Sequence, residues 1–399
     1  MTSASQETPS KAERKMHLGI LTGGGDVPGL NPAIKAVVNE AHARGWRVTG
    51  FRCGWAGLVN SDPKDLPGTA SVRTTLTPEN VRSIDRTGGT VLHTSRTNPS
   101  RMSPDDLPVF LDGRTGPAQT ETIDLTDHVL AVLDACEIDT LIAIGGDDTL
   151  SYAARLHREG AKTMCIPKTM DNDVFGTDYC IGFSTCVSRS VELINRLRTP
   201  VGSHERFLVV ELFGRNCGMT AWMSGYLADA DRSLIAEVPV DLEKLAGLLS
   251  ADRSASASNY AIAVVSEGAH VTGEDILESG PADAYGHRKL GGIGNRVGDG
   301  LKQITGVNVM VQNLGYLVRA GAPDAIDIMV PKNYGTMTIG LIEEGRTGLM
   351  VAVQDGCYTT QPADISTKGE RRVDLDAMYD IETYRPKVTQ LAGTPLYLS

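Results

Sequence analysis

The stretch HLGILTGGGDVPGLNPAIKAVV, residues 17–38, decides the fold. Its first five residues form an apolar run that predicts a buried strand, and three glycines and an aspartate follow shortly after it. Residues 31–44 place apolar side chains on one helical face, with Asn31 as the expected N-cap and Pro32 at the first helical position. Residues 48–52 read as the next strand. A strand, a glycine turn, a helix and a strand in this order form a βαβ unit, which predicts a parallel sheet.

The same pattern returns in residues 140–158, where the apolar run TLIAI leads into GGDD and then into a helix. A further short strand at residues 163–166 ends at PKTMDND, residues 167–173. Two continuous apolar strands are expected at residues 207–212 and 260–265, and such runs are typical of a sheet that is covered on both faces. The two glycine turns are therefore predicted to lie at one edge of a sheet.

Other segments follow from composition and periodicity. Helices are expected over residues 184–198 and 241–249, and a polar linker rich in serine and alanine is expected at 252–259. Residues 274–289 read as a loop because glycine and proline interrupt them. Residues 1–15 are polar and are interpreted as a disordered tail.

Composition excludes several classes of partner. The chain has 399 residues, enough for two or three domain-sized units. Its net charge of −11 argues against nucleic acid or an anionic membrane as the main partner. No apolar run approaches the ~20 residues that a membrane span requires. Seven scattered cysteines without a CxxC pair indicate neither a zinc site nor a disulfide framework, and we expect a cytoplasmic protein with free thiols.

The two glycine turns, residues 23–25 and 145–146, predict phosphate binding. A strand that ends in glycines before a helix presents backbone N–H groups and the positive helix end to an anion. Neither turn is a Walker loop or a dinucleotide fingerprint, and plain turn geometry is the alternative. Asp147 and Asp148 follow the second turn, where Mg²⁺ would bridge the protein and a phosphate. The alternative is that one of them caps the next helix.

Residues 168–173, KTMDND, place a cation, a hydroxyl and two carboxylates directly after a strand. Phosphoryl transfer to an alcohol needs a base near the hydroxyl and positive charge along the transferred group. Asp171 suits the base and Asp173 its support, while Lys168 and Thr169 suit the phosphate. The alternative is an Asx-rich turn without a catalytic role.

Four arginines stand near glycine or serine in an otherwise acidic chain, namely Arg96, Arg206, Arg215 and Arg319. Guanidinium groups match phosphate oxygens in geometry, so these positions are candidate phosphate ligands, although any one of them could be a solvated surface residue. Glu267 follows an apolar strand and could accept hydrogen bonds from sugar hydroxyls, or it could be a surface turn residue.

Taken in order, these motifs resemble the phosphofructokinase family. The ordered set is TGGGDVPGLN, GGTVLHTSR, GGDDTL, PKTMDND, GSHER, FGRNCG, SEGA and GYLVR, and the resemblance runs from about residue 17 to about residue 342. It implies an α/β enzyme of two Rossmann-like three-layer domains, with mainly parallel sheets and the active site in the interdomain cleft. The implied reaction is Mg²⁺-dependent transfer of a phosphoryl group to the 1-hydroxyl of fructose 6-phosphate.

The resemblance also implies roles for single residues. Asp171 matches the general base, Asp173 its partner, and Asp147 the magnesium position. Glu267 matches the position that binds a sugar hydroxyl. The groups expected to contact the transferred phosphate or the sugar are Gly25, Arg96, Thr169 and Arg215.

Two domains are expected, each made of two chain segments. Their boundaries are 16–182 plus 319–365 for the phosphate-donor domain and 183–318 plus 366–399 for the sugar-phosphate domain. Arg206 and Arg319 match the cations that hold the 6-phosphate, and in relatives the residue that matches Arg206 comes from a neighbouring subunit. A homodimer or homotetramer is therefore implied.

Three positions depart from the family pattern around the sugar phosphate. Phe213 stands before Gly214 where methionine is usual, and Tyr316 stands where histidine is usual. We expect Phe213, Gly214 and Tyr316 to take part in substrate binding. Met310 replaces an arginine that is often found there. Fewer cations around the sugar phosphate leave room for a related acceptor such as sedoheptulose 7-phosphate.

Two positions discriminate between phosphate donors. ATP-dependent members typically read GGDG and PGTIDND, whereas this chain has Asp148 and Lys168, which resemble the pyrophosphate-dependent branch. Two like charges ~4 Å apart cost roughly 4 kcal/mol at a surface-like dielectric, so Asp148 would repel the α-phosphate of ATP. We expect reversible transfer from pyrophosphate, giving fructose 1,6-bisphosphate and phosphate. The alternatives are an ATP-dependent 6-phosphofructokinase and a non-catalytic regulatory paralogue.

Overall fold

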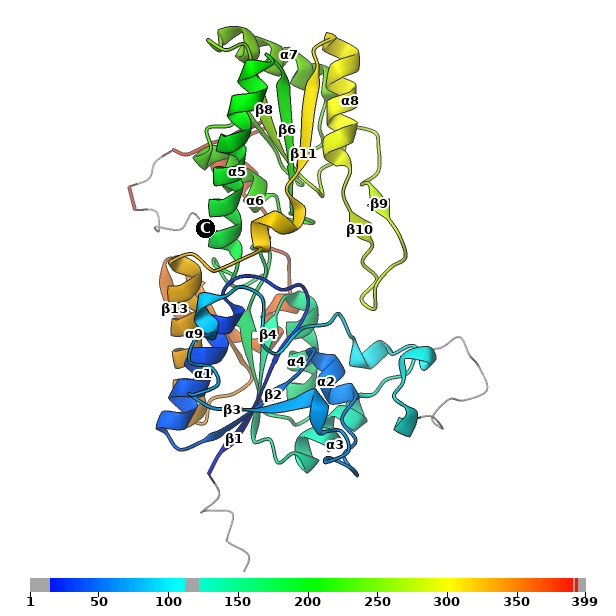
Figure 1. The fold of residues 1–399 in the computed structure, drawn as a ribbon, viewed down its shortest axis with the longest axis vertical. Helices are drawn as coiled ribbons and strands as arrows, with labels where there is room; N and C mark the ends of the chain where they lie inside the picture. The colour runs from blue at the N-terminus through cyan, green and yellow to red at the C-terminus, as the bar shows by residue number, and fades with distance from the viewer. Residues whose placement is uncertain (1–14, 112–121, 390–391, 394–399) are drawn as a thin grey trace, which may run out of the picture.

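The computed structural model describes residues 15–111, 122–389 and 392–393, and the ribbon shows two α/β halves stacked along the long axis of the molecule (Figure 1). One half contains a seven-stranded sheet and the other a four-stranded sheet. The predicted α/β class with mainly parallel sheets is confirmed. The predicted tail, residues 1–15, lies outside the described residues except for Lys15.

The larger sheet has the order β13-β12-β5-β4-β1-β2-β3. Its strands are β1 (His17–Thr22), β2 (Arg47–Phe51), β3 (Arg73–Leu76), β4 (Thr140–Gly145), β5 (Thr163–Pro167), β12 (Leu349–Gln354) and β13 (Cys357–Pro362). The five central strands run parallel, and β3 and β13 pair antiparallel at the two edges. Because β1 and β4 are parallel neighbours, both glycine turns lie at the same edge of this sheet, as predicted.

Alternate side chains of these strands enter two different hydrophobic cores. Leu18 and Ile20 pack in one core, whereas Leu21 packs in the other. This alternation follows from the two-residue period of a strand and produces a three-layer sandwich. The covering helices are α1 (Leu30–Ala43) and α9 (Ile326–Glu343) on one face, and α2 (Trp55–Val59), α3 (Thr126–Ala135) and α4 (Asp147–Arg158) on the other (Figure 1).

The smaller sheet is entirely parallel. Its order is β11 (Val309–Asn313), β6 (Phe207–Leu212), β8 (Ala261–Ser266) and β7 (Arg232–Leu234). The helices α5 (Phe183–Ser203), α6 (Met219–Leu227), α7 (Leu242–Ala255) and α8 (Ile293–Thr305) contact it, α5 packing on α6 and α7 on α8. The core of this half is continuous with the core under α1 and α9, so one apolar cluster joins the two halves.

The remaining elements are short. They are η1 (Ala70–Val72), η2 (Ile84–Arg86), η3 (Pro99–Arg101), η4 (Pro104–Asp106), η5 (Val109–Leu111), η6 (Gly315–Arg319), η7 (Ala363–Thr367), α10 (Leu375–Met378), and the strand pairs β9 (Glu278–Ser279) with β10 (Lys289–Leu290) and β14 (Tyr379–Asp380) with β15 (Arg385–Pro386). Among the described residues, none of the helices has both the length and the apolar character that crossing a membrane demands.

A buried carboxylate fixes the joint between the halves. Asp327 at the start of α9 accepts hydrogen bonds from the hydroxyl of Tyr179 at 2.7 Å and from the backbone N–H of Gly182 at 2.7 Å. It also accepts from the backbone N–H and the hydroxyl of Thr185 at 2.8 and 2.7 Å. These bonds hold the first turn of α5 against α9. Burial nevertheless raises the pKa of Asp327 to about 6.

Two local predictions at helix starts and chain linkers were wrong. Gly29 is the N-cap of α1, and Asn31 lies inside the helix, where its side chain accepts from the N–H of Val91 at 2.9 Å. The first half of the expected linker at 252–259 is helical, because α7 continues to Ala255. Asp252 in its last turns pairs with buried Arg232 at 2.6 Å, a tertiary contact that no local pattern predicts.

Two further segments also differ from expectation. Helix α5 continues through Pro200 to Ser203, five residues beyond its predicted end. Residues 274–289 are not a simple loop, since β9 and β10 pair within and beside them as a short hairpin. The proposed domain boundaries stay a prediction, although the strands of the larger sheet fall in segments 16–182 and 319–365 and those of the smaller sheet in segment 183–318.

Candidate active site

A cavity of about 800 Å³ opens between the two halves of the molecule. The loops after β1, β4 and β5 line it from the larger sheet, and the loop after β6 lines it from the smaller one. The carboxyl ends of parallel strands are where α/β proteins bind ligands. The predicted site residues that line it are Gly25, Arg96, Asp147, Asp148, Lys168, Thr169, Asp171, Asp173 and Arg215.

Cations surround the first glycine turn. The ammonium group of Lys168 donates to the carbonyl oxygen of Gly25 at 2.6 Å, and Arg319 pairs with Asp26 at 3.4 Å. Lys168 is only 3% exposed. Burial and the nearby positive charge of Arg319 lower the pKa of Lys168 to about 8. The first turn is therefore the end of the cavity best suited to bind an anion.

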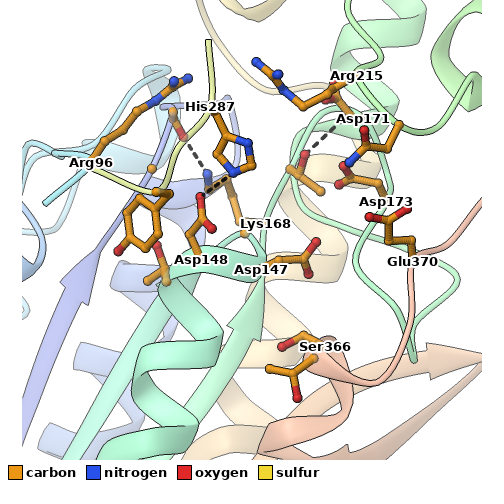
Figure 2. A pocket seen from close by; sticks show the side chains of 18 of the residues that line it. Arg96, Asp147, Asp148, Lys168, Asp171, Asp173, Arg215, His287, Ser366 and Glu370 are labelled. Atoms are coloured by element: carbon orange, nitrogen blue, oxygen red, sulfur yellow. Dashed lines mark hydrogen bonds and ion pairs between the residues drawn. The ribbon is translucent and has the colours of Figure 1, made fainter. Parts of the chain in front are cut away.

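Carboxylates surround the second glycine turn. Helix α4 begins at Asp147, and its N-cap is Gly146 without a capping side chain, so the capping alternative for Asp147 and Asp148 fails. The two neighbouring acids point in different directions, Asp148 toward His287 and Asp147 toward Asp173 and Glu370 (Figure 2). The two aspartates therefore serve different parts of the cavity.

Asp147 fits the role of a magnesium ligand. Burial, followed by the charges of Asp173 and Asp148, raises the pKa of Asp147 to about 8. Its Oδ1 atom is buried and, among the described residues, has no hydrogen-bond partner. Mg²⁺ prefers such hard oxygen ligands and commonly takes one or two carboxylates together with water and phosphate oxygens. The described residues hold no cluster of three or more His, Cys, Asp or Glu able to bind a metal alone.

The loop after β5 brings Asp171 and Asp173 together. Burial raises the pKa of Asp171 well above its usual value, and the charges of Asp173 and Glu267 add to the effect. Burial also raises the pKa of Asp173. The N–H of Asp171 donates to the hydroxyl of Thr169 at 3.2 Å. The negative charge of Asp173 therefore disfavours ionisation of Asp171.

Asn172, between these two aspartates, fixes the shape of the loop. Its backbone adopts a left-handed conformation with φ of 57°, and it is 2% exposed. Its side chain accepts from the N–H of Cys180 at 2.8 Å and donates to the carbonyl of Asp178 at 3.0 Å. The bond from Cys180 spans eight residues, so it is not the two-residue bond of an Asx-turn, and the roles of the two flanking carboxylates stay a prediction.

The acceptor side of the cavity is formed by the loop after β6. Arg215 opposes the rise in the pKa of Asp171 through its backbone N–H and its charge, and its guanidinium donates to the carbonyl of Arg288 at 2.6 Å. Glu267 does not line the cavity itself, but it lies close enough to act electrostatically on Asp171. Burial raises the pKa of Glu267 to about 7, against the opposing charge of Arg215. Gly214 also lies behind the cavity wall, with φ of 139°, which favours glycine.

Two aromatic rings hold the guanidinium of Arg319 beside the first glycine turn. The guanidinium of Arg319 lies over the ring of Tyr316 at 4.4 Å and over that of Phe213 at 5.8 Å. The two rings meet edge to face at 6.3 Å. None of the three lines the cavity. Phe213 and Tyr316, which depart from the family pattern, thus act on the site by positioning Arg319.

Arg206 is not brought to the cavity. It precedes the first residue of β6, whereas Arg215 follows the last, so the two lie at opposite ends of that strand. The expectation that a neighbouring subunit brings this residue to the site stays a prediction.

Sequence reasoning missed two segments that line the cavity. The first is the hairpin loop with Asp283, Tyr285 and His287, and the second is residues 366–372, which include Glu370. Both lie outside the glycine and arginine motifs, and their only signal is a few charged residues near glycine. Glu370 lies near enough to act on the charge of Asp147.

The fold and the cavity together define a class. Two parallel sheets face a cleft whose walls carry glycine turns, buried cations and crowded carboxylates, which is the pattern of an α/β enzyme that handles phosphate. The family model for phosphofructokinase matches residues 17–342. The chain belongs to the phosphofructokinase family, which confirms the resemblance seen in the motifs.

Three relatives illustrate the likeness. The chain is 36% identical over 367 residues to the pyrophosphate–fructose 6-phosphate 1-phosphotransferase of Dictyoglomus thermophilum, covering 92% of this chain and 96% of the relative. It is 36% identical over 354 residues to the ATP-dependent 6-phosphofructokinase of Chloroflexus aggregans, covering 88% and 91%. The phosphofructokinase structure from Saccharomyces cerevisiae superposes with a TM-score of 0.72 at 24% identity, covering 89% of this chain and 45% of that one. The chain thus spans less than half of the yeast chain.

Proposed function

We propose that the protein transfers a phosphoryl group from pyrophosphate to the 1-hydroxyl of fructose 6-phosphate, giving fructose 1,6-bisphosphate and phosphate in a reversible reaction. One observation carries the choice of donor. Asp148 lines the cavity one residue after the proposed magnesium ligand, and His287 holds its carboxylate at 3.3 Å. A carboxylate held there takes up space beside the phosphate site and repels the α-phosphate of a nucleotide.

The relatives make the donor a question for experiment. Proteins named for pyrophosphate and for ATP are equally similar to this chain, at 36% identity each. The acid at position 148 therefore supports pyrophosphate, and the names alone do not decide.

The reaction is derived from the residues of the cavity as follows. Asp171 takes the proton of the 1-hydroxyl as its oxygen bonds to the terminal phosphorus of pyrophosphate, and the bond to the other phosphate breaks. Because burial raises the pKa of Asp171 well above its usual value, this carboxyl holds the proton more firmly than an exposed one would. Lys168 and Arg215 bind the oxygens of the transferred group. Asp147 would hold Mg²⁺, whose charge offsets that of the phosphate oxygens.

The remaining expectations belong to the same proposal. A second copy of the chain would supply Arg206 to the sugar 6-phosphate, in a homodimer or homotetramer. The enzyme would act in the cytoplasm, and sedoheptulose 7-phosphate remains an alternative acceptor. An ATP-dependent enzyme is the alternative on the donor side. A non-catalytic paralogue is disfavoured because Asp147, Asp171 and Asp173 all line the cavity.

A donor panel tests the proposal. Purified protein, Mg²⁺ and fructose 6-phosphate are combined with pyrophosphate, ATP or GTP as the phosphate donor. Turnover is expected only in the reaction that contains pyrophosphate. Two variants separate the effect of the charge from that of side-chain volume. Asp148→Asn removes the charge at nearly constant volume, and Asp148→Gly removes both the charge and the volume. If repulsion dominates, Asp148→Asn already raises kcat/KM for ATP, with about a thousandfold as the upper limit. Wild-type turnover with ATP and none with pyrophosphate would refute the proposal.

A further inference from the structure

A loop from the acceptor half reaches across the cavity to the donor half. It comprises residues 283–288 at the tip of the β9–β10 hairpin, which projects from the smaller sheet toward the larger one (Figure 1). Asp283, Tyr285 and His287 line the cavity. The motifs of the family resemblance do not include this loop.

Three side chains of the loop contact the donor half. Asp283 pairs with Arg96 at 3.0 Å, and His287 lies 3.3 Å from the carboxylate of Asp148 (Figure 2). The hydroxyl of Tyr285 donates to the carbonyl of Thr97 at 2.9 Å. The loop therefore touches two of the predicted donor-binding residues, Arg96 and Asp148.

The loop is preorganised by its own hydrogen bonds. The carboxylate of Asp283 accepts from the backbone N–H groups of Tyr285 and His287, each at 3.0 Å. The backbone of Asp283 accepts from Gly286 at 2.9 Å, and Gly286 has φ of 94°. A tight turn of this kind holds its side chains in place at little further entropy cost.

The position of the loop determines which part of a donor it meets. His287, Asp283 and Arg96 act electrostatically on Asp148, whereas Arg319, Asp173, Asp26 and also Arg96 act on Lys168. A diphosphate bound on Lys168 and the first turn would extend toward Asp148, and anything longer would meet the loop beyond it. Because the Arg96–Asp283 pair is 59% and 20% exposed, it is a weak ion pair that a phosphate can replace.

We propose that residues 283–288 form a donor strap, in which Tyr285 and His287 determine specificity by closing the cavity beyond Asp148 against a nucleoside. The strap leaves room for a diphosphate, which exchanges the contact of Arg96 with Asp283 for a contact with phosphate oxygens. The inference deepens the proposed function and rests on it in one respect, namely that the donor lies between Lys168 and Asp148.

The test measures ADP binding and needs no turnover. Asp148 would repel ADP in any strap variant, so the comparison is made in the Asp148→Gly background. There, the added changes Tyr285→Ala and His287→Ala are expected to lower the Kd of ADP at least tenfold by isothermal titration calorimetry. A matched control is Lys289→Ala in the same background, an exposed residue of β10 that should leave the Kd unchanged. A decrease of less than tenfold in the Kd of ADP would overturn the proposed role of the strap.

A second variant keeps the test valid if the double substitution disturbs folding. Asp283→Asn retains an oxygen for the N–H groups of Tyr285 and His287 but removes the charge that holds Arg96. The KM for pyrophosphate is expected to fall about two- to threefold with kcat unchanged, because Arg96 no longer needs to be released. A KM for pyrophosphate that is unchanged or raised would contradict the proposal that Arg96 exchanges Asp283 for phosphate oxygens. If wild-type protein does not use pyrophosphate, the proposed function fails, while the ADP titration still decides on the strap.

Discussion

Two strands of one sheet end in the same signature, glycines followed by aspartate, yet the two turns have opposite surroundings. The turn after β1 meets Lys168 and Arg319, and the turn after β4 meets the carboxylate of Asp173. The signature sets the backbone shape, and residues far away in the chain set the charge. Under the proposed function, these similar motifs would bind opposite parts of one ligand complex, phosphate at one turn and cation at the other.

The two turns also share a physical constraint that has nothing to do with ligands. Thr149, in the first turn of α4, packs against both. A Cβ atom on Gly23 would lie 2.4 Å from the Thr149 hydroxyl oxygen, and one on Gly145 would lie 2.4 Å from the Thr149 Cβ atom. Close packing against Thr149 therefore requires glycine at both positions, whatever the turns bind.

The largest effect is expected at the proposed base, Asp171. Asp171→Asn should lower kcat about 10²- to 10⁴-fold, because proton transfer is lost, while the KM for fructose 6-phosphate changes little. Thermal stability should stay equal or rise, since burial and neighbouring charges disfavour the carboxylate. Steady-state kinetics with a melting curve measure both. A kcat within threefold of wild type would show that another group takes the proton.

The second effect compares the two turns directly. Asp147→Asn should raise the Mg²⁺ concentration needed for half-maximal activity about 10- to 100-fold, since a ligand charge is lost. Asp26→Asn, the matched change in the first turn, should alter it less than threefold, because Asp26 faces Arg319. Magnesium titrations of the two variants provide the measurement. Equal shifts would mean that the two turns do not differ in role.

The third effect concerns the shared packing on Thr149. Gly23→Ala should destabilise the protein by about 1–3 kcal/mol, because the new methyl group overlaps the Thr149 side chain. Adding Thr149→Ala should recover part of that loss, which a double-mutant cycle in urea unfolding would show as coupling. If the losses in the free energy of unfolding are purely additive, the requirement for glycine at position 23 does not come from Thr149.

The smallest effect is a pH dependence at the first turn. Lys168, with a pKa of about 8, is charged below that pH and neutral above it. Pyrophosphate binding to the free enzyme should therefore weaken as pH rises through 8, and kcat/KM should fall by up to about tenfold per pH unit. The ratio of wild type to Lys168→Met, measured from pH 7 to 9, cancels the ionisation of pyrophosphate itself. A ratio that stays constant over this range would contradict the assignment.

Sequence reasoning placed β1, β2, β4, β5, β6 and β8, the glycine turns and the DND loop because each has a local signature, but it did not place β3, β7, β11, β12 and β13. It failed where tertiary contacts decide. Asn31 looks like a helix cap but ties α1 to the loop at Val91, and Asp252 extends α7 by pairing with Arg232. His287 joins the site through a hairpin that has no motif of its own, so only the folded chain brings it to Asp148.

The late segment at residues 366–372 has a consequence for biosynthesis. Gly24 and Arg372 line the same cavity although they are 348 positions apart (372 − 24 = 348). A ribosome releases the first glycine turn long before residue 372, so the cavity lacks part of its wall until that residue has emerged. Nascent chains that end before residue 366 would therefore lack part of the site that we propose for the phosphate donor.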